Sequence, residues 1–477
     1  MPKIKISSQQ RVAVSEIRSN FANAMSDMYR FEVPLYGTLL DMVKQVNQLE
    51  LDKKPKLREQ LEETHELQRL SSERHGAIRL GKADELFTMR RLFGVMGMYP
   101  VSYYDLTEAG IPVHSTAFRP LQKDELSSNP FRIFTSLLRL DLIKDENLRQ
   151  QADELLSRRS IFSDNLIRLI DTSEQQNGLN VEQAQQFVAE ALQTFRWHHQ
   201  ATVDLDTYQH FLQMHGLVAD IVCFKGPHIN HLTPRTLNID EAQQLMSDYG
   251  LQAKAIIEGP PQRKHPILLR QTSFKALDEE IQFQQINGES EVGSHTARFG
   301  EIEQRGIALT AKGRELYDRL LNEVRLAVPD AVNNVDAYYH QLGDIFQQFP
   351  DDLIQLHNMG LAYFSYRVNP HKLPNSFSQL NTLVTNHEIL IQPITYEDFL
   401  PVSAAGIFQS NLQGQETQLF SRSHNQQLFE KDLGCKVINE FDYYAKMQID
   451  SLQDCLQQLR VDENQQKQLI KQLEGTT

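Results

Sequence analysis

The order of predicted elements repeats once along the chain, and this repeat limits the possible folds more than any other feature of the sequence. Between residues 76 and 140, a short apolar segment is followed by a helical pattern and then by three segments rich in β-branched and aromatic residues. This pattern predicts the order β-α-β-β-β. The same order is expected again from residue 217, with strands over 217–224, 253–258, 266–274 and 296–309 and a helix over 240–249.

Two histidine–arginine pairs occupy equivalent places in the two units. His75 and Arg79 precede the first predicted helix, and His231 and Arg235 precede the second. The offset between the units is 156 residues for both pairs (231 − 75 and 235 − 79). Together with the repeated element order, this spacing indicates a duplicated module. We therefore expect His75 and His231 to face each other where the two modules meet.

Two glutamates could complete a metal site with these histidines. Glu301 and Glu303 lie two apart in a predicted strand and so share one face. A buried acidic pair is costly unless a cation neutralises it. Two histidines and one carboxylate are typical of non-haem iron(II) oxygenases. Either glutamate can be the third ligand, or both can pair with Arg298 and Arg305 on a solvated face.

Several segments resemble the 2-oxoadipate dioxygenase/decarboxylase family, also called hydroxyglutarate synthase. They are RHGAIR (74–79), NHLTPR (230–235), RQTSFKA (270–276) and PVS (401–403). The EIEQR segment at 301–305 resembles the last metal-ligand strand of 4-hydroxyphenylpyruvate dioxygenase, and the duplicated element order resembles the vicinal oxygen chelate fold. The resemblance extends from about residue 15 to about residue 411.

This resemblance implies an iron(II) enzyme that converts 2-oxoadipate and O2 to 2-hydroxyglutarate and CO2, a reaction of lysine catabolism. It implies His75, His231 and one glutamate as the iron ligands. Glu301 is preferred because it occupies the acid's place before Gln-Arg, and Glu303 is the alternative.

The resemblance also implies the groups that bind the substrate. Arg79 would bind one carboxylate of the substrate, since its planar guanidinium can donate two charge-assisted hydrogen bonds. Val402 and Ser403 would contact the other end through their main chain. No catalytic group is expected beyond the metal ligands.

Each of these assignments has an alternative. His228 could replace His231 as a ligand or orient it, Arg79 could form only a structural ion pair, and Arg235 is expected to support the fold. Gln271 could approach the site. Four further histidines are expected at the surface of a helical insertion and not at the metal site: His198, His199, His210 and His215. At the level of function, the alternatives are a metal-dependent lyase or isomerase of the vicinal oxygen chelate type and a non-catalytic metal-binding scaffold.

The predicted fold is of the α+β class. Two β-α-β-β-β modules are expected to form a partly open β-barrel, with helical insertions and a helical C-terminus. We expect an N-terminal helical segment (1–70), the first module (71–143) and a helical insertion (144–216). The second module with metal ligands (217–311) and a C-terminal helical and loop region that completes the site (312–477) follow.

Composition excludes several partners. Forty-eight Lys and Arg against 62 Asp and Glu give a net charge of −14, which disfavours nucleic-acid binding. No segment reaches the ~20 apolar residues of a membrane span, and the polar N-terminus lacks a secretion signal. We therefore expect a cytoplasmic enzyme whose partners are a small 2-oxo dicarboxylate and O2; the sequence does not assign an oligomeric state.

Overall fold

The computed structural model describes residues 11–107, 110–285, 290–374, 376–377, 379–400 and 424–474. The chain divides into two compact units. Unit 1 comprises Met1–Lys254, Ser273–Ile302 and Phe399–Val437, and unit 2 comprises Ala255–Thr272, Glu303–Asp398 and Ile438–Thr477. No helix in the described part of the chain is both long and apolar enough to cross a lipid bilayer.

Unit 1 begins with four helices, which lie in the predicted N-terminal helical segment. They are α1 (Val14–Glu32), α2 (Pro34–Lys53), α3 (Pro55–Glu63) and α4 (Glu66–Leu70). Proline stands at the first position of α2 and of α3, where its missing N–H has no intrahelical partner to lose. The helices α1 and α2 bury one face each, which includes Phe21, Met25 and Tyr29 of α1.

A five-stranded sheet at the centre of unit 1 contains the first predicted module. The elements are β1 (Arg74–Leu80), α5 (Ala83–Val95), β2 (Tyr99–Asp105), β3 (Val113–Arg119), α6 (Lys123–Ser128) and β4 (Arg132–Leu138). The strand order is β2-β3-β4-β1-β5, in which β1 runs parallel to β4 and antiparallel to β5 (Leu232–Pro234). The β-α-β-β-β order is thus confirmed for the first half, with a short added helix before its last strand.

The second half departs from the prediction at two expected strands that do not form and at one hairpin, residues 278–284 and 290–296, that was not expected. Residues 217–224 were expected as a strand, but the structure has helix α11 (Gly216–Val222) there. Its residues 217–222 are all buried, and an apolar run of this length suits a buried helix as well as a buried strand. Segment 253–258 was also expected as a strand, but it forms only isolated bridges, from Ala253 to Phe274 and from Glu258 to Gln271.

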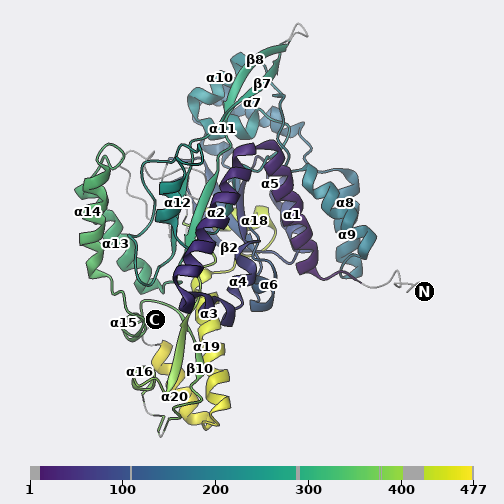
Figure 1. Cartoon of the computed structure of the whole chain (residues 1–477). Helices are drawn as coiled ribbons and strands as arrows, with labels where there is room; N and C mark the ends of the chain where they lie inside the picture. The colour runs from purple at the N-terminus through teal and green to yellow at the C-terminus, as the bar shows by residue number, and fades with distance from the viewer. Residues whose placement is uncertain are drawn as a thin grey trace, which may run out of the picture. The chain divides into compact units, whose positions relative to one another are not determined.

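The remaining elements of the second half are short. They are α12 (Ile239–Leu245), β6 (Leu269–Ser273), β7 (Asp278–Gln284), β8 (Ser290–Thr296) and β9 (Glu301–Arg305). β7 and β8 pair as an antiparallel hairpin beside α10 (Leu205–Met214) and α11 (Figure 1). The α+β class is confirmed, whereas a complete second module in a partly open barrel stays a prediction.

Further helices complete unit 1. α7 (Glu146–Ser157), α8 (Asp164–Gln176) and α9 (Val181–Gln193) lie with α10 in the predicted helical insertion, and α18 (His424–Leu433) follows much later in the chain. Side chains of Ser163, Asn180 and Asp204 cap α8, α9 and α10 by accepting hydrogen bonds from backbone N–H groups of the first turn.

Unit 2 is mostly helical and has its own core. Its elements are α13 (Ala311–Ala327), α14 (Val335–Ile345), α15 (Leu353–Asn358), β10 (Phe364–Val368), α16 (Leu380–Thr385), β11 (Ile389–Pro393), α19 (Glu440–Gln458) and α20 (Glu463–Glu474). β10 and β11 pair antiparallel. This ribbon packs with α16, α19 and α20 around Tyr366, Leu383, Ile389, Leu452 and Leu469 (Figure 1).

Candidate metal centre

Three fully buried side chains of unit 1 form a group that can hold a metal ion. His75 lies on β1, His231 directly precedes β5, and Glu301 begins β9. One ligand atom from each residue lies within 4.8 Å of the others. His75 Nε2 is 3.0 Å from Glu301 Oε1, and His231 Nε2 is 3.9 Å from the same oxygen. The structure therefore brings together the two histidines that the repeated spacing singled out and the glutamate that the family resemblance preferred.

The pairing of β1 with β5 places the two histidines side by side. His75 is opposite Thr233 and Gly76 is opposite Leu232, and the backbone N–H of Asn230 donates to the Ala77 carbonyl at 3.0 Å. A Cβ at Gly76 would lie 2.6 Å from Ile229 Cδ1 and 3.0 Å from the His231 carbonyl oxygen. Glycine at this position therefore permits the close approach of the segment that carries His231.

Local contacts also fix the chain around Glu301. The preceding Gly300 packs against Phe274, whose Cε1 would be 1.9 Å from a Cβ at that position. The Tyr29 hydroxyl, from α1, lies 3.0 Å from the Asn230 carbonyl oxygen and 2.9 Å from that of Phe299. One buried hydroxyl thus holds the segments before His231 and before Glu301 together.

A threonine hydroxyl orients the Glu301 carboxylate. Thr233 Oγ1 donates to Glu301 Oε1 at 2.9 Å, and Thr233 is itself fully buried. Because Thr233 is the β5 residue opposite His75, the strand pairing that brings the histidines together also positions the carboxylate.

The ring nitrogens of His231 are suited to bind a metal ion. Neither of its ring nitrogens makes a hydrogen bond with the described residues, although the ring is fully buried. Burial, together with the electrostatic effect of His75 and Arg79, holds the pKa of the His231 imidazole well below its usual value. A neutral imidazole is the form that binds a metal. An unpaired buried nitrogen is costly, and a bound cation would remove that cost.

The separations among the three groups fit one metal ion. Two ligands at about 2.1 Å from an ion lie about 3 Å apart when adjacent and about 4.2 Å apart when opposite. The observed 3.0 and 3.9 Å fall in this range. The rings of Phe399 and Phe299 pack against His75 and His231, with centroids 4.9 and 4.8 Å away. The donor set, the burial and the spacing therefore all suit a metal, without fixing which metal it is.

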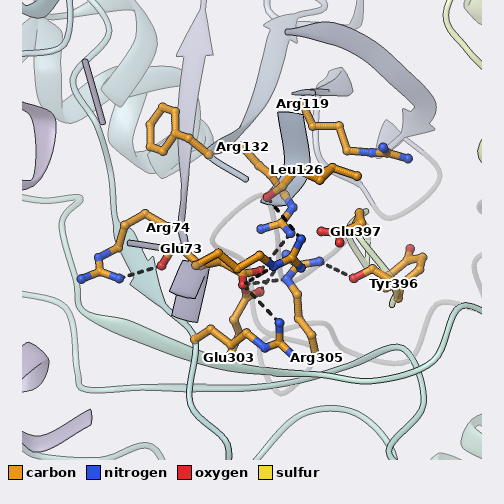
Figure 2. Close-up of polar contacts among 12 residues, drawn as sticks. Glu73, Arg74, Arg119, Leu126, Arg132, Glu303, Arg305, Tyr396 and Glu397 are labelled. Carbon is orange, nitrogen blue, oxygen red and sulfur yellow. Dashed lines mark hydrogen bonds and ion pairs between the residues drawn. The ribbon is translucent and has the colours of Figure 1, made fainter. Parts of the chain in front are cut away.

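Glu303, the alternative third ligand, has a different set of contacts. In unit 2 both of its carboxylate oxygens accept from Arg305, at 2.8 and 3.0 Å, and Arg305 also donates to the Tyr396 carbonyl at 2.8 Å (Figure 2). Among the described residues, the metal-capable groups do not include Glu303. The pairing with Arg305 is one of the alternatives that the sequence left open.

A second buried group, which the sequence did not reveal as a group, lies next to Arg79. Asp220 of α11, His228 and His295 of β8 have ligand atoms within 4.8 Å of one another. Asp220 Oδ2 is 2.6 Å from Arg79 Nη1, so Arg79 forms the ion pair that was considered as its alternative role. The signal was Asp220, the single charged residue in the apolar run 217–224.

The remaining predicted residues are placed as follows. Val402 and Ser403 lie outside the described residues. Arg235 pairs with Glu66 at 2.8 Å and Glu73 at 3.2 Å, as expected of a residue that supports the fold. Gln271 is buried in unit 2, where its backbone exchanges two hydrogen bonds with Glu258. Of the four other histidines, His199 and His210 are exposed, whereas His198 and His215 are half-buried.

Comparisons with known proteins relate this chain to one family. The family model described as 2-oxoadipate dioxygenase/decarboxylase matches residues 21–411. A protein of that name from Escherichia coli (strain K12) is 53% identical over 454 residues, covering 93% of this chain and 98% of the relative. Another of that name from Mycobacterium tuberculosis is 38% identical over 412 residues, covering 85% of this chain and 89% of the relative.

The structural comparison gives the same relationship. A crystal structure of the hydroxyglutarate synthase from Pseudomonas putida in complex with 2-oxoadipate superposes with a TM-score of 0.87 at 49% identity. The match covers 94% of this chain and 99% of that one. A second structure, of the hydroxyglutarate synthase from Pseudomonas putida, has a TM-score of 0.84 at 47% identity over the same shares of the two chains.

Proposed function

The chain belongs to the 2-oxoadipate dioxygenase/decarboxylase family, and we propose that it converts 2-oxoadipate and O2 to 2-hydroxyglutarate and CO2 at an iron(II) ion bound by His75, His231 and Glu301. The observation that carries the proposal is the buried group of two histidines and one carboxylate within 4.8 Å in a member of this family. Two histidines and a carboxylate are the usual ligands of non-haem iron(II) oxygenases and leave coordination positions open.

The protein residues prepare the ion and its surroundings. Bound iron(II) would supply the activation of O2 and a site at which the keto oxygen and the adjacent carboxylate of the substrate chelate. His75 and His231 offer neutral nitrogen donors, and Glu301 offers one negative charge, so the ligands neutralise only half of the ion's charge. The remaining charge attracts the anionic end of the substrate.

Burial and hydrogen bonding give the ligands their orientation. Thr233 holds Glu301 through its hydroxyl, and Tyr29 holds the backbone before both Glu301 and His231. Phe299 and Phe399 pack against the histidine rings and exclude water from their vicinity. A dry site with fixed ligands strengthens electrostatic interactions with the reacting groups.

Arg79 is proposed to bind the distal carboxylate of the substrate. His75 and Arg79 are four residues apart on β1, so their side chains project from the same face and their Cα atoms are about 13 Å apart. A dicarboxylate held at one end by the metal can then be held at its other end by the guanidinium, which fixes the carbon chain between them. Val402 and Ser403 are proposed to contact, through their main chain, the end of the substrate opposite to the carboxylate that Arg79 binds.

The proposal is tested by following O2, CO2 and product together. Purified protein with iron(II), ascorbate and 2-oxoadipate should consume one O2 and release one CO2 for each 2-hydroxyglutarate formed. With ¹⁸O2, both labelled atoms should appear in 2-hydroxyglutarate, because CO2 derives from the original carboxylate. Turnover without O2 would instead favour a metal-dependent lyase or isomerase, and the proposal would be wrong.

Single substitutions test the ligand assignment. His75→Ala, His231→Ala and Glu301→Gln should each abolish turnover and lower iron content. Glu303→Gln is the matched control on the same strand: it breaks the buried pair with Arg305, so it should lower thermal stability, but the folded protein should retain iron and turnover. Iron retained by Glu301→Gln and lost in Glu303→Gln would reverse the assignment of the two glutamates.

A further inference from the structure

The Asp220 carboxylate is the centre of a buried hydrogen-bond cluster on the side of Arg79. Its Oδ1 lies 2.9 Å from His295 Nε2 and 3.2 Å from His228 Nε2, while its Oδ2 lies 2.6 Å from Arg79 Nη1. Asp220 and its two histidine partners are each at most 6% exposed. A carboxylate only accepts hydrogen bonds, so both histidines present an Nε2–H to it.

The partners of the cluster fix its protonation and orientation. Because His295 carries its proton on Nε2, its Nδ1 accepts from the Tyr208 hydroxyl, which is 2.9 Å away. Burial raises the pKa of the Asp220 carboxyl, but the electrostatic effect of His228 and Arg79 and the hydrogen bonds from both histidines outweigh burial and hold the pKa well below its usual value. Asp220 is therefore an anion whose two oxygens are aimed by their donors.

Asn230 links this cluster to the metal ligands. With its amide oriented so that both atoms are satisfied, it donates to the Ala77 carbonyl at 3.2 Å and accepts from Arg79 Nη1 at 2.8 Å and from His228 Nε2 at 3.1 Å. Asn230 directly precedes His231, and Ala77 lies midway between His75 and Arg79 on β1. The residues that hold Arg79 are thus bonded to the segment that carries a metal ligand.

Asp220, His228 and His295 could be taken for a second metal site, but their hydrogen bonds argue against that. The position in front of Asp220 Oδ2 already holds the cationic guanidinium of Arg79 at 2.6 Å, and a second cation there would be repelled. Both histidine nitrogens that face Asp220 carry a proton: His295 Nε2 donates to Asp220 at 2.9 Å, and His228 Nε2 lies between Asp220 Oδ1 and the Asn230 oxygen, at 3.2 and 3.1 Å. In the His75–His231–Glu301 group, by contrast, both nitrogens of His231 lack a hydrogen bond with the described residues.

We propose that Asp220, held by His228 and His295, is a positioning residue that fixes the Arg79 guanidinium at a set distance from the metal ligands and thereby selects the chain length of the substrate. This rests on the proposed role of Arg79. Both contacts of Asp220 and Asn230 with Arg79 use Nη1, which restrains rotation of the planar guanidinium. A guanidinium held in place accepts the dicarboxylate whose length spans the gap, and penalises one that is a carbon shorter or longer.

The test compares 2-oxo dicarboxylates of five, six and seven carbons. In the wild-type protein, kcat/KM and the anaerobic affinity measured by calorimetry should both be highest for the six-carbon acid. In Asp220→Asn the ratio of kcat/KM for the six-carbon acid to kcat/KM for the five- or seven-carbon acid should fall by roughly 10- to 100-fold. A misplacement of the Arg79 guanidinium by about 1 Å is expected to have an effect of this size. Tyr208→Phe removes only the hydrogen bond to His295 and should lower the ratio less.

A matched control separates positioning from a loss of stability. Glu85 forms a buried bidentate pair with Arg159 in the same unit, at 2.8 and 2.7 Å. Glu85→Gln should lower thermal stability and leave the chain-length ratio unchanged. In an Arg79→Ala background, Asp220→Asn should cause no further change in the ratio, because its effect is transmitted through Arg79.

The possible results are distinct. A ratio that stays constant in both Asp220→Asn and Tyr208→Phe overturns the inference, even though turnover of 2-oxoadipate by the wild type upholds the proposed function. A second equivalent of bound metal in the wild type, lost in Asp220→Asn, also overturns it in favour of a metal site. A wild-type protein that neither binds nor turns over any of the three acids refutes the proposed function as well.

Discussion

Replacing Thr233 by valine tests whether the metal centre depends on the hydroxyl that orients Glu301. Valine has nearly the shape of threonine and suits a β-strand equally well. The substitution therefore removes one hydrogen bond, from Thr233 Oγ1 to Glu301 Oε1 at 2.9 Å, and little else. Thr233 is fully buried, so water cannot readily replace the hydroxyl.

The expected loss follows from the type of bond. A hydrogen bond to a charged group contributes about 1.5–3 kcal/mol, and each 1.4 kcal/mol corresponds to about tenfold in an equilibrium constant. Residues that orient metal ligands typically change affinity by about 10- to 100-fold when substituted. We therefore expect Thr233→Val to bind metal about 10- to 100-fold more weakly, measured anaerobically by competition with a chelator of known affinity.

Thr135 provides the matched control. It lies on β4 of the same sheet, is fully buried, and its hydroxyl has no hydrogen-bond partner among the described residues. Thr135→Val should leave metal affinity unchanged and raise the free energy of unfolding slightly, because a buried unpaired hydroxyl is removed. Equal metal affinities for wild type and Thr233→Val would refute the reasoning, as would equal losses in the two variants.

Two further predictions concern packing and pH. Gly300→Ala places a Cβ 1.9 Å from Phe274 Cε1, so the start of the strand must shift. The free energy of unfolding should therefore fall by about 1–3 kcal/mol, and the metal content of the protein should drop. A folded variant with full metal content would contradict this. Burial, with the positive charge of Arg139, lowers the pKa of His114 to about 3. Below about pH 6.5 the unfolded chain therefore binds a proton at His114, whereas the folded chain binds it only near pH 3. The free energy of unfolding should therefore fall as the pH drops below 6.5, and in His114→Gln denaturant unfolding should show a slope smaller by about 1.4 kcal/mol per pH unit; identical slopes would show that His114 is not the source.

The first half of the fold could be predicted because its signals are local. A short apolar segment predicted β1, a helical pattern predicted α5, and segments rich in β-branched and aromatic residues predicted β2 to β4. Residues 217–224 were predicted wrongly because an apolar run without alternation has no period that distinguishes a buried helix from a buried strand. The helix start is marked by the His215 ring, which accepts from the Leu217 N–H at 3.1 Å, and histidine is not a usual capping residue.

The candidate site could be predicted only in part, for a related reason. The repeated spacing pointed to His75 and His231, but the choice between Glu301 and Glu303 depends on which partner each carboxylate meets in space. Glu303 has Arg305 two residues away on the same strand face, a pairing that the sequence could suggest but not decide. The Asp220 cluster was missed because its three members come from a helix, a loop and a strand that only tertiary packing brings together.

The charges of these buried groups also imply an order of binding. Glu301 and Asp220 are two carboxylates, Arg79 is one cation, and the paired histidine nitrogens carry no net charge in the assigned tautomers, so these groups together have one uncompensated negative charge. A dicarboxylate that approaches them is repelled, and the protein as a whole, at −14, provides no long-range attraction. A divalent cation reverses the sign of the local charge. For the proposed reaction we therefore expect the metal to bind before the substrate, and we expect Arg79, whose charge is already offset by Asp220, to contribute orientation more than attraction.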